Sequence, residues 1–204
     1  MPERKPRADA ARNREAVLAA ADGLFARCAD PDEVTMAEIA AAAGVGKGTL
    51  FRGFGDRTGL IRALYEARSA PVLRAVAEGP APLGPGTPPA ERVPAVLDAL
   101  LCLKLDNRHL SVALEAVGSD SPYSAAHYDR AHGLIRGMLE AVPGFGDGGF
   151  AAHALLAAVR ADLVDHLAGR QGLSRERLRA DLADFTARVL GRPQQGEGSA
   201  GARG

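Results

Sequence analysis

Apolar side chains recur at three- and four-residue spacing along most of the chain, which is the pattern of amphipathic α-helices. The first such stretch covers residues 8–27, and a longer one covers residues 57–78, which Pro71 is expected to kink or restart. Segments rich in Gly, Pro, Ser and Asp separate five more predicted helices. These span residues 90–105, 108–117, 124–142, 150–170 and 175–190. The pattern predicts an all-α fold.

Two short helices joined by a glycine turn are predicted between residues 35 and 54. Thr35 can cap the first helix, and Glu38 stands three residues later in capping-box position. Gly44 can adopt the positive φ that ends a helix at no steric cost, and Leu50 and Phe54 give the second helix an inward face. This is a helix-turn-helix, whose second helix reads DNA in the major groove.

The segment Gly44-Val-Gly-Lys-Gly-Thr49 also resembles the end of a nucleotide-binding P-loop, which would indicate an enzyme. A P-loop needs another glycine where Ala41 stands and a buried β-strand before the loop. The preceding run from Glu38 to Ala43 is alanine-rich and helical in pattern, so this alternative is the weaker one.

Residues 35–60 resemble the DNA-binding segment of tetracycline-repressor-like (TetR-family) regulators. They share its order of a helix, an Ala-Gly-Val turn, a Lys-Gly-Thr-Leu-aromatic helix, Phe54 and then Asp56-Arg57. The resemblance is strong over residues 12–64 and architectural after that. It implies a three-helix DNA-binding domain with its N-terminal arm in residues 1–56, a helical effector-binding and dimerisation domain in residues 57–190, and a disordered tail from residue 191.

The resemblance also implies which residues contact DNA. They are Thr35, Lys47, Gly48, Thr49, Phe51, Arg52 and Arg57. Phe51 stands where the family most often has tyrosine, Gly53 where histidine is common, Gly46 where serine or threonine is common, and Arg57 where lysine is common. Arg52 and Arg57 can still grip phosphate through their guanidinium groups.

Charge composition requires any DNA affinity to be local. The 204 residues include 25 Lys and Arg and 25 Asp and Glu, so the formal net charge is zero. Five basic residues crowd the N-terminus: Arg4, Lys5, Arg7, Arg12 and Arg14. This arm either follows DNA phosphates or a minor groove, or is a solubilising tail.

Leucine-rich faces on the last two long helices are candidates for a homodimer interface. The residues of these faces are Leu155, Val159, Leu163, Leu178, Leu182 and Phe185. They either form a four-helix bundle with a second copy or pack on the chain's own body. A dimer would allow two recognition helices to read two half-sites of a palindromic operator.

A small-molecule effector is expected to bind among the middle helices, where apolar side chains with a few polar ones can form a pocket. The candidate lining residues are Leu100, Leu103, His109, Leu114, Tyr123, His127 and Met138. The histidine spacings provide no set of metal ligands, so neither a metal nor a cofactor is expected.

No Gly-x-Ser-x-Gly, His-Glu-x-x-His or dinucleotide-binding motif occurs, which argues against an enzyme. Cys28 and Cys102 are too few for a disulfide scaffold and are expected to be small core residues. The chain lacks an apolar run of membrane-spanning length and a signal peptide, so a cytoplasmic location is expected. The sequence therefore favours a DNA-binding repressor that an effector releases, with an all-helical partner-binding protein as the alternative.

Overall fold

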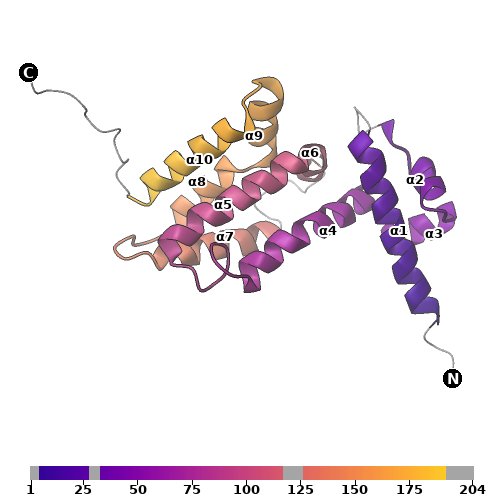
Figure 1. Ribbon diagram of the computed structural model, residues 1–204, viewed down its shortest axis with the longest axis horizontal. Helices are drawn as coiled ribbons and strands as arrows, with labels where there is room; N and C mark the ends of the chain where they lie inside the picture. The colour runs from indigo at the N-terminus through magenta and orange to yellow at the C-terminus, as the bar shows by residue number, and fades with distance from the viewer. Residues whose placement is uncertain (1–4, 28–32, 117–125, 192–204) are drawn as a thin grey trace, which may run out of the picture. The chain divides into compact units, whose positions relative to one another are not determined.

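The computed structural model describes residues 5–27, 33–116 and 126–191, and all regular elements within these ranges are helical (Figure 1). In chain order they are α1 (Lys5–Arg27), α2 (Met36–Ala42), α3 (Lys47–Phe54), α4 (Arg57–Glu78), α5 (Pro89–Asp106), α6 (Arg108–Ala116), α7 (Ala126–Glu140), α8 (Gly149–Ala158), α9 (Ala161–Asp165), the π-helix η3 (His166–Arg170) and α10 (Arg175–Val189). The prediction of an all-α fold is confirmed. The predicted tail beyond Gly191 and the predicted core residue Cys28 lie outside the described residues.

The chain forms two compact units. The head comprises Met1–Ala70 and His109–Val117, and the body comprises Pro71–Arg108 and Gly118–Gly204. Helix α4 therefore begins in the head and ends in the body, and the chain re-enters the head at the start of α6. This division differs from the expected boundary after Asp56, because residues of α4 and α6 pack into the core of the head.

Buried side chains from all helices of the head share one core. Val17, Ile39 and Leu50 come from α1, α2 and α3, while Leu60 and Leu110 come from α4 and α6. Full burial of such side chains contributes about 1.5–3 kcal/mol each, so α4 and α6 are integral to the stability of the head. An ion pair between Arg68 and Asp22 additionally links α4 to α1.

The core of the body joins α5, α7, α8 and α10. Its fully buried members include Leu97 of α5, Ile135 and Leu139 of α7, and Leu155 of α8, and Leu182 of α10 packs against them. Two ion pairs also join α10 to α5: Arg179 with Asp98, and Arg175 with Asp106. These contacts hold α10 against its own chain.

The prediction of one helix over residues 150–170 is wrong, because the chain breaks at Arg160. The backbone of Arg160 is extended, with ψ 146°, and α9 begins at the next residue. Asp162 accepts hydrogen bonds from the Arg160 guanidinium at 2.8–3.0 Å and from the backbone N–H of Leu163 at 2.8 Å. Such local side-chain bonds offer the backbone an alternative to a continuous helix. Periodicity alone does not reveal them.

Helix α4 is assigned without interruption through Pro71, so the chain does not restart there. Leu73, two residues after Pro71, is 55 % exposed. The predicted loop after α4 is confirmed as non-helical, and Arg92 fixes it within the body. Its Nε donates to the Leu83 carbonyl at 2.8 Å and its second guanidinium nitrogen donates to the Val76 carbonyl at 2.7 Å.

Candidate nucleic-acid interface

A complete capping box begins α2. The backbone N–H of Glu38 donates to Thr35 Oγ1 at 3.2 Å, and the backbone N–H of Thr35 donates to Glu38 Oε2 at 2.8 Å. The Thr35 hydroxyl donates to the same carboxylate oxygen at 2.8 Å. The backbone bond, followed by the hydroxyl bond, lowers the pKa of Glu38 below its ordinary value. The predicted start of the helix-turn-helix is therefore confirmed in its atomic detail.

The predicted glycine turn joins α2 to α3. Gly44 has φ +66°, in the left-handed region where glycine escapes the Cβ clash of other residues. The backbone N–H of Val45 then donates to the Ala40 carbonyl at 3.0 Å, and the Val45 side chain packs against the core of the head. This turn, with a helix on each side, replaces the strand-to-loop geometry that a P-loop requires.

Helix α3 is anchored by one face and exposed on the other. Leu50 is almost completely buried in the head, with Phe54 packed beside it. Lys47, Gly48, Thr49, Phe51 and Arg52 are exposed. Gly46 stands at the N-cap and supplies no side-chain acceptor. The N-terminus of α3 can therefore present its amides and its positive dipole end to a phosphate.

Glycine is also required where α3 meets α4. A Cβ on Gly59 would lie 2.0 Å from the backbone oxygen of Phe54, so no other side chain fits this close approach. The backbone N–H of Gly59 donates to Asp56 Oδ1 at 2.8 Å, which caps the start of α4. The Asp56-to-Gly59 segment thus holds the recognition helix at a fixed distance from α4.

Two arginines lie over aromatic rings of the head. The Arg14 guanidinium of α1 lies 4.8 Å from the centroid of the Phe54 ring, at the end of α3. Arg57 lies 5.9 Å from the centroid of the Phe25 ring. Such cation–π contacts hold the guanidinium in place and leave its positive charge available to a phosphate. The sequence placed Arg14 in a basic arm but gave no signal of its contact with Phe54, which joins residues 40 positions apart.

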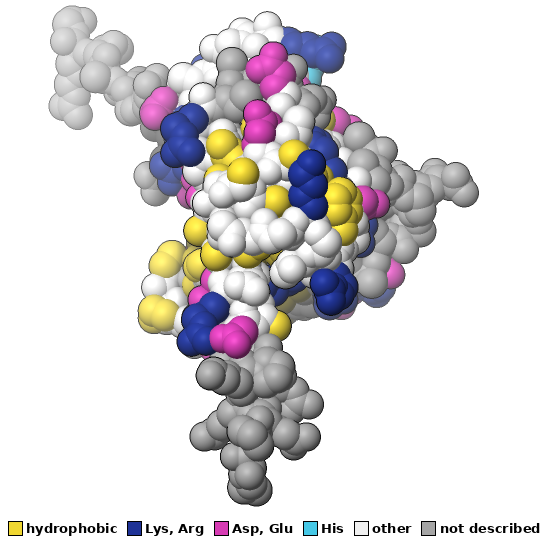
Figure 2. Space-filling view, turned by 90° about the vertical axis from the view of Figure 1, so that its right-hand side faces the viewer, with side chains coloured by type: hydrophobic (Ala, Val, Ile, Leu, Met, Phe, Trp, Pro, Cys, Tyr) yellow, Lys and Arg dark blue, Asp and Glu magenta, His cyan; other side chains and the backbone are white. Residues whose placement is uncertain are grey.

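Among the side chains described on the face shown in Figure 2, the basic ones lie in separate groups and do not form one continuous patch. This agrees with the zero net charge of the sequence. Of the predicted DNA contacts, those on α3 share one exposed face, while Arg57 is half-buried. The Thr35 hydroxyl already donates its hydrogen to Glu38, so its role as a cap is seen and its contact with phosphate stays a prediction.

The predicted effector-pocket residues are distributed over both units. In the body, Leu103 and Met138 are buried, and Met138 and Leu100 belong to the core. In the head, Leu114 packs against the core and His109 is exposed. Tyr123 and the side chain of His127 lie outside the described residues. The described residues of this set thus include tightly packed positions, and their role in a pocket stays a prediction.

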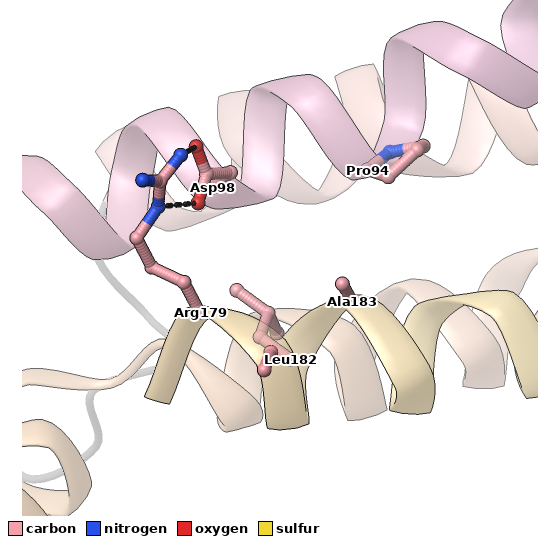
Figure 3. Close-up of a pocket in the computed structure, with 6 residues that line it drawn as sticks. Pro94, Asp98, Arg179, Leu182 and Ala183 are labelled. Carbon is pink, nitrogen blue, oxygen red and sulfur yellow. Dashed lines mark hydrogen bonds and ion pairs between the residues drawn. The ribbon is translucent and has the colours of Figure 1, made fainter. Parts of the chain in front are cut away.

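A groove of about 370 Å³ lies between α5 and α10 of the body. Pro94 and Asp98 line one side, and Arg179, Leu182 and Ala183 line the other, with Ala180 completing it (Figure 3). The Arg179 guanidinium donates two hydrogen bonds to the Asp98 carboxylate, at 2.6 and 2.8 Å. Leu182 is the one residue that the groove shares with the predicted sites. Both charges at the groove therefore already have partners.

A cluster of rings joins α7 to α8. The rings of His132 and His153 stack with centroids 3.9 Å apart, and Tyr128 lies nearly parallel to both. Tyr128 Oη and His153 Nδ1 are 2.6 Å apart, and His132 Nε2 donates to the Gly149 carbonyl at 3.1 Å. Sequence spacing could not pair His132 with His153, because they lie on different helices. Across the described ranges, no three His, Cys, Asp or Glu side chains are grouped to hold a metal ion.

The predicted dimer residues divide into buried and exposed groups. Leu155, Val159, Leu178 and Leu182 are buried within the core of their own body, as the alternative interpretation of these faces had it. Leu163 and Phe185 are exposed, and so is Phe150 at the start of α8, which the sequence analysis did not single out. Only the exposed group is free to contact a second copy without unpacking the body.

The capped α2, the glycine turn and the anchored but exposed α3 define a DNA-binding protein of the helix-turn-helix class. Residues 17–64 match the family described as bacterial regulatory proteins, tetR family. This match covers the segment that carries the helix-turn-helix and identifies that segment as a DNA-binding domain of the tetR family. A comparison with the curated proteins gives no match.

Solved structures of TetR regulators share the fold. A TetR-like regulator from Rhodococcus sp. RHA1 is 23 % identical, with a TM-score of 0.61, over 88 % of this chain and 96 % of that one. FadR of Thermus thermophilus, a repressor solved with lauroyl-CoA, is 20 % identical, with a TM-score of 0.58, over 94 % and 100 %. LfrR of Mycobacterium smegmatis, solved with proflavine, is 24 % identical, with a TM-score of 0.51, over 89 % and 97 %. The likeness extends the shared fold beyond the matched segment into the body.

In the portion of the chain that is described, none of the helices is both long and apolar enough to cross a membrane.

Proposed function

We propose that this regulator is a repressor that binds a palindromic operator as a homodimer and releases it when a small molecule occupies the body. The observation that carries the proposal is the exposed face of α3, from Lys47 to Arg52, held on the head by buried Leu50. Bacterial DNA lies in the cytoplasm, so the protein is proposed to act there.

The positions of the side chains on α3 support the proposed contacts with DNA. Lys47, Gly48 and Thr49 form the first turn of α3, the part of a recognition helix that lies nearest to base edges. Lys47 neutralises a phosphate or donates to guanine, and Thr49 contacts a phosphate or a thymine methyl group. Arg52 and Arg57 extend the phosphate contacts on either side of the turn into α4.

The homodimer is proposed to form through the side chains that the body leaves exposed. These are Phe150 at the start of α8, Leu163 of α9 and Phe185 of α10, with exposed fractions of 86 %, 37 % and 38 %. A single recognition helix buries little surface, whereas two helices about 34–36 Å apart can occupy successive major grooves on one side of the DNA.

The effector is proposed to be a small organic molecule that binds the body. Two structural neighbours were solved with lauroyl-CoA and proflavine, which differ in size, charge and shape, so this proposal stops at the general class. Met138 is buried in the core of the body and Leu100 packs against this core, so a ligand that binds there has to displace packed side chains. A ligand that opens this space therefore changes how the helices of the body pack.

Two covalent connections can transmit such a change to DNA binding. Helix α4 passes from the head into the body at Pro71, and the chain returns to the head where α6 begins. Since Leu60 of α4 and Leu110 of α6 are buried in the head, movement of either helix disturbs the support of α3. Shifting the population from 1:99 to 99:1 requires about 5.5 kcal/mol of differential ligand affinity.

Lys47→Ala tests the proposed interface in the full-length protein. The affinity for DNA is measured over a range of salt concentrations, with Lys104→Ala as the matched loss of one lysine from the body. A phosphate contact predicts weaker binding to every sequence and a salt slope reduced by about 0.9 for each subunit, or about 1.8 for the proposed dimer. A guanine contact predicts that selectivity relaxes at one base position. Equal affinity of Lys47→Ala and the parent protein would remove Lys47 from the interface.

The partner-binding alternative makes a different prediction for the same titration. A largely apolar protein interface responds weakly to salt, whereas DNA binding through phosphates weakens steeply. Failure to bind any DNA at low salt would therefore favour a protein partner.

A further inference from the structure

The recognition helix carries an exposed aromatic ring, which is one of the predicted DNA contacts but has no assigned partner on the DNA. Phe51 of α3 is 48 % exposed, although the large apolar side chains on either side of it in sequence and space, Leu50 and Phe54, pack into the head. Its ring has no hydroxyl group, so it cannot form a hydrogen bond with a phosphate. The exposed ring is therefore available for an apolar contact in a complex.

Phe51 lies on the same side of α3 as residues of its first turn. Phe51 follows Lys47 by four residues and Gly48 by three, so the three residues lie on one side of the helix. A Cβ at Gly48 would meet nothing within 4 Å, which leaves the surface beside the ring open. The backbone of α3 can therefore approach DNA closely at Gly48, with the Phe51 ring entering the groove one turn further along.

The major groove offers one apolar group to such a ring. Among the four bases, the edges exposed there carry hydrogen-bond donors and acceptors, and thymine alone adds a C5-methyl group. We propose that Phe51 is a specificity-determining residue that packs against the methyl group of one thymine in each operator half-site. The inference rests on the proposed function and identifies a base that the same helix reads.

The magnitude follows from the size of the group. Burial of one CH₂-sized group is worth about 0.8 kcal/mol, which corresponds to about a four-fold change in affinity. Replacing that thymine by deoxyuridine removes the methyl group and leaves the base-pairing pattern unchanged. The substitution is therefore expected to weaken binding of the parent protein about four-fold at one position of each half-site.

The experiment combines this DNA change with a protein change. Binding sites are selected from random-sequence DNA with the full-length protein, and each thymine of the selected site is replaced in turn by deoxyuridine. The dissociation constant is then measured for the parent, for Phe51→Ala and for Thr49→Ala. Leu134→Ala, which removes a part-exposed leucine from α7 of the body, is the control. Circular dichroism checks that each variant is folded. We expect folded variants, because the replaced side chains are exposed and contribute little to the core.

The proposal predicts one methyl-sensitive thymine per half-site for the parent, Thr49→Ala and Leu134→Ala, and loss of that sensitivity in Phe51→Ala alone. It is overturned if no thymine is methyl-sensitive, or if Phe51→Ala weakens binding but keeps the sensitivity, since the ring would then pack on sugar and phosphate. Loss of the sensitivity in Thr49→Ala instead would assign the methyl contact to Thr49. If no DNA sequence is selected at all, the proposed function itself fails, which separates that outcome from a failure of the Phe51 assignment.

Discussion

Gly48 allows the stability of the recognition helix to be separated from its contact with DNA. It lies in α3 with helical backbone, and a Cβ added there would meet no atom of the protein within 4 Å. Gly48→Ala should therefore remain folded. Because glycine loses more conformational freedom than alanine on entering a helix, the substitution should stabilise the protein by about 0.5–1 kcal/mol.

The same methyl group should weaken binding to DNA. If the first turn of α3 lies against the groove, the added Cβ occupies space that the DNA fills in the complex. Inserting a methyl group into a packed contact costs about 1–3 kcal/mol, which is roughly a 5- to 150-fold loss of affinity at each half-site. The variant would thus be more stable and yet bind more weakly.

Gly137→Ala is the matched control, because Gly137 is an exposed residue of α7 whose Cβ would also meet nothing within 4 Å. It should bring a similar gain in stability with unchanged DNA affinity. Urea unfolding followed by circular dichroism gives the stability, and a fluorescence-anisotropy titration on a selected site gives the affinity. Unchanged DNA affinity of a folded Gly48→Ala would refute the placement of the first turn of α3 against the groove.

Three further predictions concern stability and assembly. The pKa of Glu38 is lowered in the folded head, so the ionised carboxylate contributes stability above the ordinary pKa of 4.5, and this contribution is lost as the pH falls through the lower folded pKa. Glu38→Gln should therefore flatten this part of the profile of unfolding free energy against pH. An unchanged profile would contradict the capping role. Pro71→Ala, at an exposed position inside α4, restores a backbone donor and should stabilise the protein by about 1–3 kcal/mol, measured by urea unfolding, whereas a lower stability would show that α4 depends on the proline. Phe185→Glu should convert the proposed dimer to monomer in sedimentation, with Leu73→Glu, at an exposed apolar residue of α4, as the control; a dimer that persists would place the interface elsewhere.

The helix-turn-helix could be predicted in detail because its determinants are local. Thr35 and Glu38 stand three residues apart, Gly44 is needed for the turn, and Leu50 lies one helical turn beyond Gly46. Each interaction joins residues close in sequence, so spacing alone identifies it. The N-cap of α10, where Ser174 accepts from the backbone N–H of Arg177, was predictable for the same reason.

Most of the differences arose where contacts join distant residues, and one arose from a local side-chain pair. Helical spacing of leucines indicates a buried face but not the surface against which it packs. The spacing of Leu155 and Leu182 therefore fitted a dimer interface as well as the core of the body, in which they lie. The packing of Leu110 in the head depends on a contact between α6 and helices more than 40 residues earlier in the chain. The break at Arg160 depends on the side-chain pair with Asp162, which competes with helical periodicity.

The central claim is that the full-length protein binds a two-fold-symmetric DNA site through two copies of α3. The most direct measurement is footprinting on the DNA upstream of its own coding region, together with selection from random-sequence DNA, at moderate salt. The account predicts protection of two half-sites with centres about 10–10.5 base pairs apart, or a multiple of that spacing, and affinity that falls steeply as salt rises. A single unpaired half-site would contradict the dimeric arrangement, and the absence of both protection and sequence enrichment would contradict the assignment of α3 as a DNA-reading helix.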